Sequence, residues 1–440
     1  MIHKLRVTES QYTELVNRMS PGNTVALGFC GRRTGEAVDV LCAREIHYLS
    51  AIEQPDAIEG MRQRAASHGW GIVVFRKRTD KQAQIDPSDS KSANTCREVD
   101  AIVDLFDDGT LQGHLCSAGT PSPISLISVV GTDLHFWFGR SVESRTASDF
   151  NVRFGQAFGA RTRALLQRLS IAVVGCSGTG SIVIEQLVRL GVGHLVIVDP
   201  DVVEEKNLDR ILNATMDDAR LGCHKVDVLA RAIDSTGLGT RVDPIPHDLL
   251  TPSAVKRVAA CDVLFGCVDG AEGRYLMNKL AVFYSMPYID VGVRLDADGE
   301  GGVNQVCGTV HYLQPGGSSL LSRKAITMKA VEAEGLKRTN PQAYQSQLKS
   351  KYIIGVQEDR PAIIPVNMHY ASLAVIEFLA RLHTFRVEGN APFAQLGSSL
   401  SDPRFEPVLP DGEPCHVLSR HVGRGDIVPL LDSPYLSEEQ

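Results

Sequence analysis

A glycine-rich turn and four charged residues downstream of it are the part of the sequence best suited to chemistry. The turn reads Gly175-Cys-Ser-Gly178-Thr-Gly180, and its glycines let backbone N–H groups approach a phosphate at the start of a helix. Asp199 lies where a carboxylate can accept hydrogen bonds from ribose hydroxyls. Arg210 and Lys225 can neutralise phosphate oxygens, and Asp269 can hold magnesium. Together these residue types predict a nucleotide site.

The turn alone is a weak signal, because similar turns serve several functions. Its glycine order is Gly-x-x-Gly-x-Gly, whereas dinucleotide-binding dehydrogenases typically have Gly-x-Gly-x-x-Gly. No recognisable hydride-transfer site follows the turn, which disfavours an NAD-dependent oxidoreductase but leaves it as an alternative. A further alternative is that the glycines serve only tight packing of a strand against a helix.

The elements that must position these residues alternate between strands and helices. Residues 171–174 predict a strand, 181–190 a helix and 194–199 a second strand, which together form a βαβ unit. Further helices are predicted at 225–233, 272–284 and 366–382, further strands at 241–245, 262–266 and 287–293, and a polar helical segment interrupted by Pro341 at 324–351. This alternation predicts an α/β fold with a Rossmann-like, doubly wound and mostly parallel sheet.

The pattern before residue 147 is different. Short β-like runs occur at 24–29, 38–41, 71–75 and 123–130, and the polar stretch 141–146 reads as a linker. We therefore predict two domains: a smaller N-terminal α+β domain at 1–146, and the α/β domain at 147–440.

Composition excludes several functional classes. With 43% hydrophobic and 22% charged residues, the chain is typical of folded globular protein, and the formal net charge of −7 argues against a nucleic-acid partner. No apolar run approaches the ~18 residues of a membrane helix, and the first residues lack the apolar core of a secretion signal. The ten cysteines show no repeated spacing and are interpreted as reduced thiols. We expect a cytoplasmic protein without a membrane partner.

Four separated motifs resemble the ubiquitin-activating-enzyme superfamily of adenylyltransferases, the ThiF/MoeB/HesA type, over roughly 150–385. They are Val198-Asp199-Pro-Asp201, Asn207-Leu-Asp-Arg210, Gly222-Cys-His-Lys225, and Cys267-Val-Asp269 through Arg274 to Asn278. The resemblance assigns ATP binding to Gly175, Gly178, Gly180, Asp199, Asp201, Asn207, Arg210, Lys225 and Asp269. It assigns catalysis to Arg210 and Lys225 at the phosphates and to Asp269 as the Mg²⁺ ligand. Ser177 and Ile211 depart from the family pattern without removing a charge, and Arg274 is either functional or part of a structural ion pair.

The resemblance implies ATP-dependent adenylation of the C-terminal carboxylate of a ubiquitin-like protein. It further implies a homodimer and a conjugating enzyme as a downstream partner. The chain resembles the activating enzymes of bacterial ubiquitination-like operons, some of which are linked to antiviral defence against phage. Adenylation of a sulfur-carrier protein or a small molecule by the same core is the main alternative.

Residues 312–352 contain a crossover and helical segment with an unusual acyl-acceptor region. The stretch from Pro315 to Arg323 resembles a bacterial Pro-Gly-Gly-x-Cys-x-x-Cys-Arg motif, but serine replaces both cysteines, at Ser319 and Ser322. The second pair would lie near Cys415, which leaves too few soft ligands for structural zinc. The serines are either inert remnants, or one of them carries the acyl group as an oxyester with His311 as a base.

Residues 20–130 weakly resemble a JAMM-type (JAB/MPN-like) isopeptidase domain. Gly71–Phe75 matches its central strand, and Asp86-Pro-Ser-Asp89 falls near its Ser-x-x-Asp motif. Arg76-Lys-Arg-Thr79 stands where the metalloenzyme has its zinc-binding His-x-His-Pro, and cationic side chains cannot ligate zinc as imidazole does. The resemblance therefore implies a catalytically inactive domain. An unrelated α+β domain is the alternative.

Overall fold

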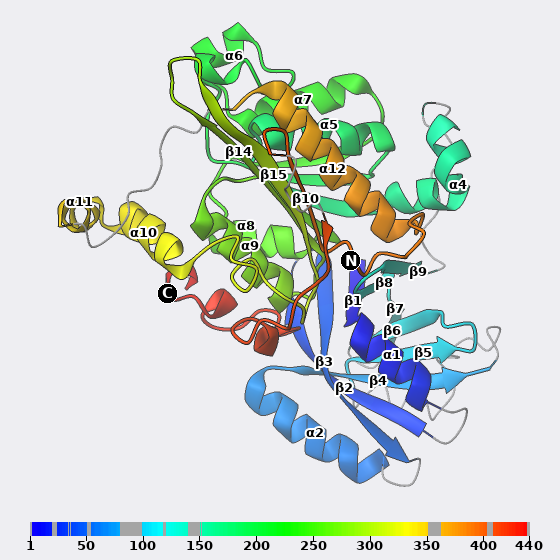
Figure 1. Ribbon diagram of the computed structural model, residues 1–440. Helices are drawn as coiled ribbons and strands as arrows, with labels where there is room; N and C mark the ends of the chain where they lie inside the picture. Colours follow the sequence, from blue (N-terminus) through cyan, green and yellow to red (C-terminus); the bar gives the residue numbers. More distant parts are fainter. Residues whose placement is uncertain are drawn as a thin grey trace. The chain divides into compact units, whose positions relative to one another are not determined.

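The computed structural model describes residues 2–19, 24–33, 35, 37–50, 54–79, 99–117, 120–139, 150, 152–350, 362–402 and 408–437. The chain forms two compact units. The first consists of Met1–Arg145, Val282–Met286 and His421–Gln440, and the second of Thr146–Ala281 and Pro287–Arg420. Each unit has its own sheet (Figure 1). The first unit thus includes a C-terminal segment that the sequence analysis assigned to the second domain.

The first unit contains a mixed, nine-stranded sheet with a helix on each face. The strands, in the order β7-β6-β5-β4-β2-β3-β1-β8-β9, are β1 (Ile2–Thr8), β2 (Thr24–Arg33), β3 (Val38–Ser50), β4 (Gly71–Arg78), β5 (Ala101–Phe106), β6 (Leu111–Ser117), β7 (Thr120–Pro123), β8 (Leu126–Val130) and β9 (Leu134–Phe138). Helix α1 (Glu9–Arg18) packs with Val73 and Phe75 of β4, and α2 (Gln54–His68) with Ile72 and Val74. Because successive strand residues point to opposite faces, the two helices cover opposite sides.

The second unit contains an eight-stranded sheet with a parallel half and an antiparallel half. Its order is β12-β11-β10-β13-β14-β15-β16-β17. The strands are β10 (Ser170–Val174), β11 (His194–Val198), β12 (Arg241–Ile245), β13 (Val263–Gly266), β14 (Tyr288–Ala297), β15 (Val303–Leu313), β16 (Gln395–Ser399) and β17 (Val408–Leu409). The first five strands pair in parallel and the rest antiparallel. The predicted Rossmann-like α/β fold is confirmed.

Helices cover both faces of this sheet. The helices are α4 (Val152–Leu166), α5 (Gly178–Leu190), α6 (Met216–Leu221), α7 (Lys225–Thr236), α8 (Pro252–Ala259), α9 (Ala271–Phe283), α10 (Met328–Thr339), α11 (Pro341–Lys349) and α12 (Ile364–Leu382). The chain moves in one direction from β10 through α5 to β11, and in the other from β13 through α9 to β14. Since such crossovers are right-handed, α5 and α9 lie on opposite faces, and α12 packs on α5 (Figure 1).

Local sequence explains where several helices begin and end. Helix α8 begins after Thr251, whose side chain accepts a hydrogen bond from the Ala254 N–H, and α7 ends at Gly237 in the left-handed conformation. The predicted interruption at Pro341 is confirmed, because α10 ends at Thr339 and the side chain of Asn340, the next residue, caps α11. Proline lacks the N–H that would continue the helix.

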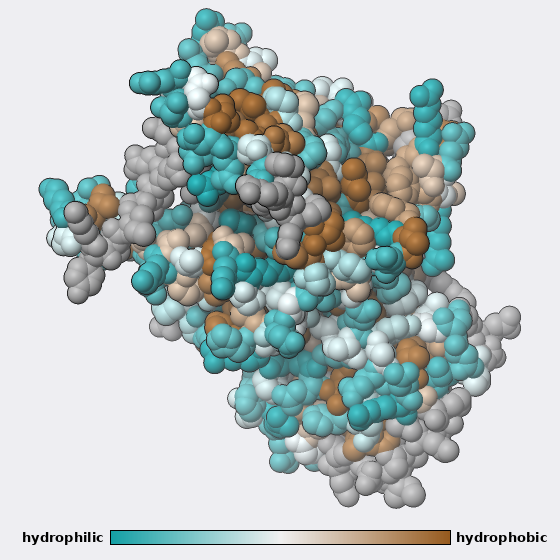
Figure 2. All heavy atoms as spheres, in the orientation of Figure 1, coloured by the Kyte–Doolittle hydropathy of each residue, from teal (hydrophilic) through white to brown (hydrophobic). Residues whose placement is uncertain are grey.

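The surface and the cysteines add two findings. Apolar side chains occur in separate patches among polar ones on the visible face (Figure 2). Of the helices in the described ranges, none has the length and the apolar composition that a membrane span requires.

Eight described cysteines are free thiols, but Cys116 is disulfide-bonded. The prediction of reduced thiols is therefore wrong for Cys116, because disulfide pairing depends on approach in space rather than on regular spacing.

The turn between β10 and α5 requires glycine for steric reasons. Gly175 has φ +91° and lies against the carbonyl group of Cys267, and a Cβ atom on Gly180 would collide with the carbonyl oxygen of Gly175. Tight packing therefore explains these two glycines, whether or not a phosphate binds the turn.

Gly180→Ala should lower the free energy of unfolding by about 2–4 kcal/mol, because the backbone of the turn must move to admit the methyl group. Gly155→Ala in α4 is the matched control, since its Cβ meets only ordinary contacts, and alanine in a helix should raise stability by up to ~1 kcal/mol. Denaturant unfolding of both variants measures the difference. Equal unfolding midpoints would contradict the steric argument.

Candidate functional site

The candidate site lies where the strand order reverses, between β10 and β13. The Cys267 N–H donates to the carbonyl of Val174 (2.8 Å), and the Gly175 N–H donates to the carbonyl of Val198 (2.9 Å). The segments that follow β10, β11 and β13 are therefore joined directly beyond the carboxyl ends of these strands. Open α/β sheets bind their ligands in the crevice at this position.

Asp199 holds the glycine turn to the segment after β11. One of its carboxylate oxygens accepts the Cys176 N–H (2.6 Å) and the other the Asp201 N–H (2.9 Å). Lys225 donates to Asp201 (2.7 Å), and its Nζ lies 3.8 Å from Asp199. Burial raises the pKa of Asp199 above its ordinary value, although Lys225 and the two N–H groups oppose this. Three predicted site residues thus form one cluster.

Arg210 lies against the glycine turn. A Cβ atom on Gly178 would be 3.2 Å from the Cδ of Arg210, and the arginine Nη1 donates to the carbonyl of Lys206 (2.7 Å). Asn207 is buried at the end of the short 3-10 helix η2 (Glu205–Asn207), and its amide oxygen accepts the Glu204 N–H. The structure therefore brings Arg210 to the turn and gives Asn207 a local capping contact.

Asp269 and Arg274 lie at the start of α9 with different environments. Asp269 is an exposed carboxylate just beyond β13. Arg274 pairs with fully buried Asp290 of β14 through Nε (2.9 Å) and Nη2, and this ion pair holds the pKa of Asp290 below its ordinary value against the effect of burial. Of the two interpretations of Arg274, the structure shows the ion pair.

The start of α9 is also covered by α10. The Glu334 carboxylate accepts the Glu272 N–H (2.8 Å), and Arg338 donates to the Glu272 side chain (2.6 and 3.1 Å). The polar helical segment is therefore attached next to the residue proposed for magnesium.

Ser319 and Ser322 share a tight turn. The Ser319 N–H donates to the Ser322 hydroxyl (2.8 Å), which donates to the Ser319 carbonyl (3.2 Å), and the Ser322 N–H donates to the Ser319 hydroxyl (3.2 Å). Ser319 is 1% exposed, whereas Ser322 is exposed. The Leu320 N–H between them donates to the side chain of Asn278 on α9 (2.9 Å). The hydroxyls thus stabilise the turn, and Ser322 is the exposed residue of the pair.

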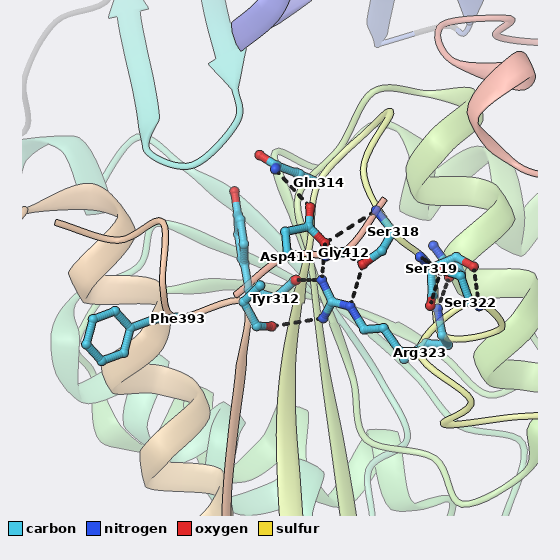
Figure 3. Close-up of polar contacts among 12 residues, drawn as sticks. Tyr312, Gln314, Ser318, Ser319, Ser322, Arg323, Phe393, Asp411 and Gly412 are labelled. Atoms are coloured by element: carbon cyan, nitrogen blue, oxygen red, sulfur yellow. Dashed lines mark hydrogen bonds and ion pairs between the residues drawn. The ribbon is translucent and has the colours of Figure 1, made fainter. Parts of the chain in front are cut away.

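A hydrogen-bond network surrounds this turn (Figure 3). Arg323 donates to the Ser318 hydroxyl (2.7 Å), to Asp411 (2.9 Å) and to the carbonyls of Tyr312 and Ala394 (both 2.9 Å). Asp411 also accepts the Ser318 hydroxyl and the Gln314 amide. The Arg323–Asp411 pair therefore connects the crossover to the C-terminal part of the second unit.

Cys415 lies close to the crossover, since its N–H donates to the carbonyl of Gly317 (3.0 Å). The two segments that the resemblance predicts to hold the cysteine pairs are therefore neighbours. The first contains Ser319 and Ser322 in place of cysteines, and the second contains the single buried thiol of Cys415. Within the described parts of the chain, no group of three or more His, Cys, Asp or Glu side chains could hold a metal ion. The donor set does not fit tetrahedral zinc.

His311 is not suited to act as a general base at neutral pH. Burial, together with the nearby Arg323 and Arg274, lowers its pKa to about 4, although Asp290 opposes this. An imidazole with so low a pKa is a weak proton acceptor. Proximity in sequence could not predict this environment.

Arg76 and Arg78, at the positions of the zinc-binding histidines in the isopeptidase resemblance, lie on β4 and pair with buried Asp104 of β5 (2.9 and 3.2 Å). The Asp86–Asp89 motif lies outside the described residues. The JAMM-like identity of this domain stays a prediction.

The sequence model of the ThiF family matches residues 151–401, which is more than half of the 440 residues. The chain belongs to the ThiF family. The match spans the glycine turn, the charged cluster, the start of α9 and the crossover.

Among curated proteins, the chain is similar to the adenylyltransferase and sulfurtransferase UBA4 of Meyerozyma guilliermondii, with 32% identity over 32% of this chain and 33% of the relative. It is similar to the ubiquitin-like modifier-activating enzyme 5 of Culex quinquefasciatus, with 28% identity over 34% and 38%. The alignments thus span little more than a third of these relatives. Among solved structures, E. coli MccB with ATP is 18% identical over 63% of this chain and 76% of that chain, with a TM-score of 0.46.

Two contacts in this ThiF-family chain were missed from the sequence. The motif that contains Asn278 does not predict its hydrogen bond to the crossover, and no sequence motif includes Asp411. The arginine that follows the serine-substituted motif was a usable signal for the second contact, because a buried arginine requires an anionic partner. Nothing in the local sequence indicates which acidic residue that partner is.

Asp411→Asn should reduce the loss in free energy of unfolding that occurs when the pH is lowered. Burial alone would raise the pKa of Asp411, but Ser318 and Arg323 hold it below its ordinary value. Its charged contacts therefore stabilise the protein fully above about pH 4, and this contribution is lost as pH falls through the lower native pKa.

Urea unfolding at pH 7 and pH 3 tests this. Wild type should lose more stability between the two pH values than Asp411→Asn. Asp217→Asn, at an exposed carboxylate of α6, should behave like wild type. Parallel acid profiles for wild type and Asp411→Asn would refute the role of the carboxylate.

Proposed function

We propose that this ThiF-family chain is an adenylyltransferase that uses ATP to activate the C-terminal carboxylate of a ubiquitin-like protein. The observation that carries the proposal is the meeting of Asp199, Lys225 and Arg210 with the glycine turn where the strand order reverses. This arrangement provides a carboxylate for ribose hydroxyls and cations for phosphate oxygens, together with the N-terminus of a long helix.

The start of α5 suits the phosphates of ATP. Its capping residue, Ser177, makes no side-chain hydrogen bond to the helix N–H groups. These N–H groups and the positive end of the helix dipole favour an anion at this position. We infer that Gly175, Gly178 and Gly180 keep the backbone close enough for the phosphates to contact it.

Asp269 suits Mg²⁺ because it is an exposed hard oxygen ligand, and Mg²⁺ is commonly held by one or two carboxylates with substrate phosphates. When bound, Mg²⁺ supplies neutralisation of phosphate charge. The substrate carboxylate attacks the α-phosphate, the acyl–phosphate bond forms, and the bond to pyrophosphate breaks. Arg210 and Lys225 stabilise the negative charge that accumulates on the phosphate oxygens.

The class of substrate is part of the proposal. Ubiquitin-like modifier-activating enzyme 5 supports a ubiquitin-like protein, and UBA4, named as an adenylyltransferase and sulfurtransferase, supports a sulfur carrier as the alternative. We also propose a homodimer, a conjugating enzyme downstream and a cytoplasmic location. Parallel assays with ubiquitin-like and sulfur-carrier proteins distinguish the two substrates.

Asp269→Ala and Arg210→Ala should each reduce ATP–pyrophosphate exchange by about 10²–10³, because each removes one preorganised electrostatic contact with the phosphates. The assay uses the full chain, Mg²⁺ and candidate partner proteins. Arg220→Ala is the matched control, since Arg220 is an exposed arginine that pairs with Asp217 on α6. Near wild-type exchange in both site variants would overturn the assignment.

We further propose that Ser322 receives the acyl group when a covalent intermediate forms. Its exposure and the burial of Ser319 support this choice. The Ser322 oxygen would attack the acyl carbonyl, an ester bond would form, the acyl–phosphate bond would break and AMP would leave, with the hydroxyl proton passing to solvent.

Ser322→Ala should abolish an ester adduct that survives thiol reductants but is cleaved by hydroxylamine, while pyrophosphate exchange persists. Ser322→Cys should convert the adduct into a reductant-sensitive thioester. Ser319→Ala is the matched control and should retain the adduct. Denaturing gels after incubation with ATP and partner measure these outcomes, and an unchanged adduct in Ser322→Ala would exclude this serine as carrier.

A further inference from the structure

The first unit carries a cluster of charged side chains that the proposed function does not use. Arg76 and Arg78 of β4, Asp104 of β5 and His114 of β6 occupy the same face of the sheet as α2, because Arg76 is in register with Asp104 and His114 with Ile102. The apolar residues under α2 lie earlier in β4, so both arginines lie at the far end of the strand. The cluster is thus a polar extension of the α2 face.

Counted over its described residues, Arg76, Arg78 and Asp104, the cluster has one more positive than negative charge. Asp104 is 6% exposed and accepts two contacts from Arg76 (2.9 and 3.4 Å), while the Nε of Arg78 lies 3.2 Å from the same carboxylate. One carboxylate, that of Asp104, therefore pairs with two guanidinium groups. Burial lowers the pKa of His114, with Asp104 opposing this and Arg76 adding to it, so this environment disfavours a charged ring.

Hydrogen-bonding capacity remains in the cluster. Arg78 is 27% exposed and its Nη groups make no hydrogen bond to any described residue. The Nδ1 atom of His114 is buried without a partner in the described part of the chain. Buried polar atoms in native proteins usually have partners, and this one lies beside arginines that the described carboxylate does not fully neutralise.

We propose that Arg76 and Arg78 form a binding site for the C-terminal carboxylate of a polypeptide. The planar guanidinium group binds a carboxylate through two parallel hydrogen bonds. One bound carboxylate neutralises the single excess charge, whereas a phosphate, with about −1.5 to −2 charges at pH 7, would overcompensate it. Charge balance therefore favours a carboxylate.

The proposed function supplies the source of this carboxylate, and only in that respect does this inference rest on it. A protein substrate that is activated at its C-terminus presents a free carboxylate before adenylation and an uncharged acyl group afterwards. The site would therefore distinguish the unreacted substrate from the activated one.

The test uses the full chain without ATP and three probes: acetylated hexaglycine with a free carboxylate, the same peptide as a C-terminal amide, and inorganic phosphate. NMR signals of the arginine Nε–H groups report binding at the side chains themselves. The free-acid peptide should bind to wild type, and Arg78→Gln should weaken this binding at least about tenfold. Asp104→Asn raises the excess charge and should tighten it, which a purely structural role of the cluster would not produce.

Arg64→Gln is the matched control, because Arg64 is an exposed arginine of α2 that pairs with Glu45. Its affinity for the peptide should equal that of wild type. Equal binding of the amide, unchanged binding in Arg78→Gln, or a preference for phosphate would each overturn the proposal. Arg210→Ala should still bind the peptide, so that failure of pyrophosphate exchange and failure of this site are separate results.

Discussion

The reversal of strand order between β10 and β13 is the constraint on which the second unit depends. Right-handed crossovers require the connecting helices to leave in opposite directions there, so no helix covers the carboxyl ends of both strands. The backbone N–H groups of Gly175 and Cys267 donate hydrogen bonds that hold the carboxyl ends of neighbouring strands together. Asp199 then ties the turn to the third strand of the crevice. The position of the charged residues thus follows from topology before any ligand is considered.

Features that depend on local chain geometry were predictable from the sequence. The βαβ unit, the glycine turn and the interruption at Pro341 each follow from residues within one short window, where periodicity and backbone restrictions dominate. The predicted strand at 194–199 is also confirmed to within one residue, because β11 ends at Val198. The family assignment was predictable because four motifs occur in order along the chain, and order is a property of the sequence itself.

Features that depend on contacts between distant segments were not predictable. Asp411 lies 88 positions after Arg323, and the segment between them contains other acidic residues with the same charge. The burial of His311 and the bonded state of Cys116 likewise depend on which strands become neighbours. For Ser319 and Ser322, sequence indicated the chemical type of the two positions, but the difference in exposure between them required the fold.

Helix α9 sets a fixed length between two parts of the second unit. It begins beside Asp269, and seven residues later Asn278 holds the Leu320 N–H, which at 1.5 Å per residue is a span of about 10 Å. A helix cannot shorten to bring its first turn and Asn278 together. In the proposed reaction, a group passing from ATP at Asp269 to the turn that contains Ser322 would therefore have to cover this span by moving itself, or the turn would first have to release Asn278. The hydrogen bond to the Asn278 carboxamide is thus one of the contacts that such a movement of the turn would have to break.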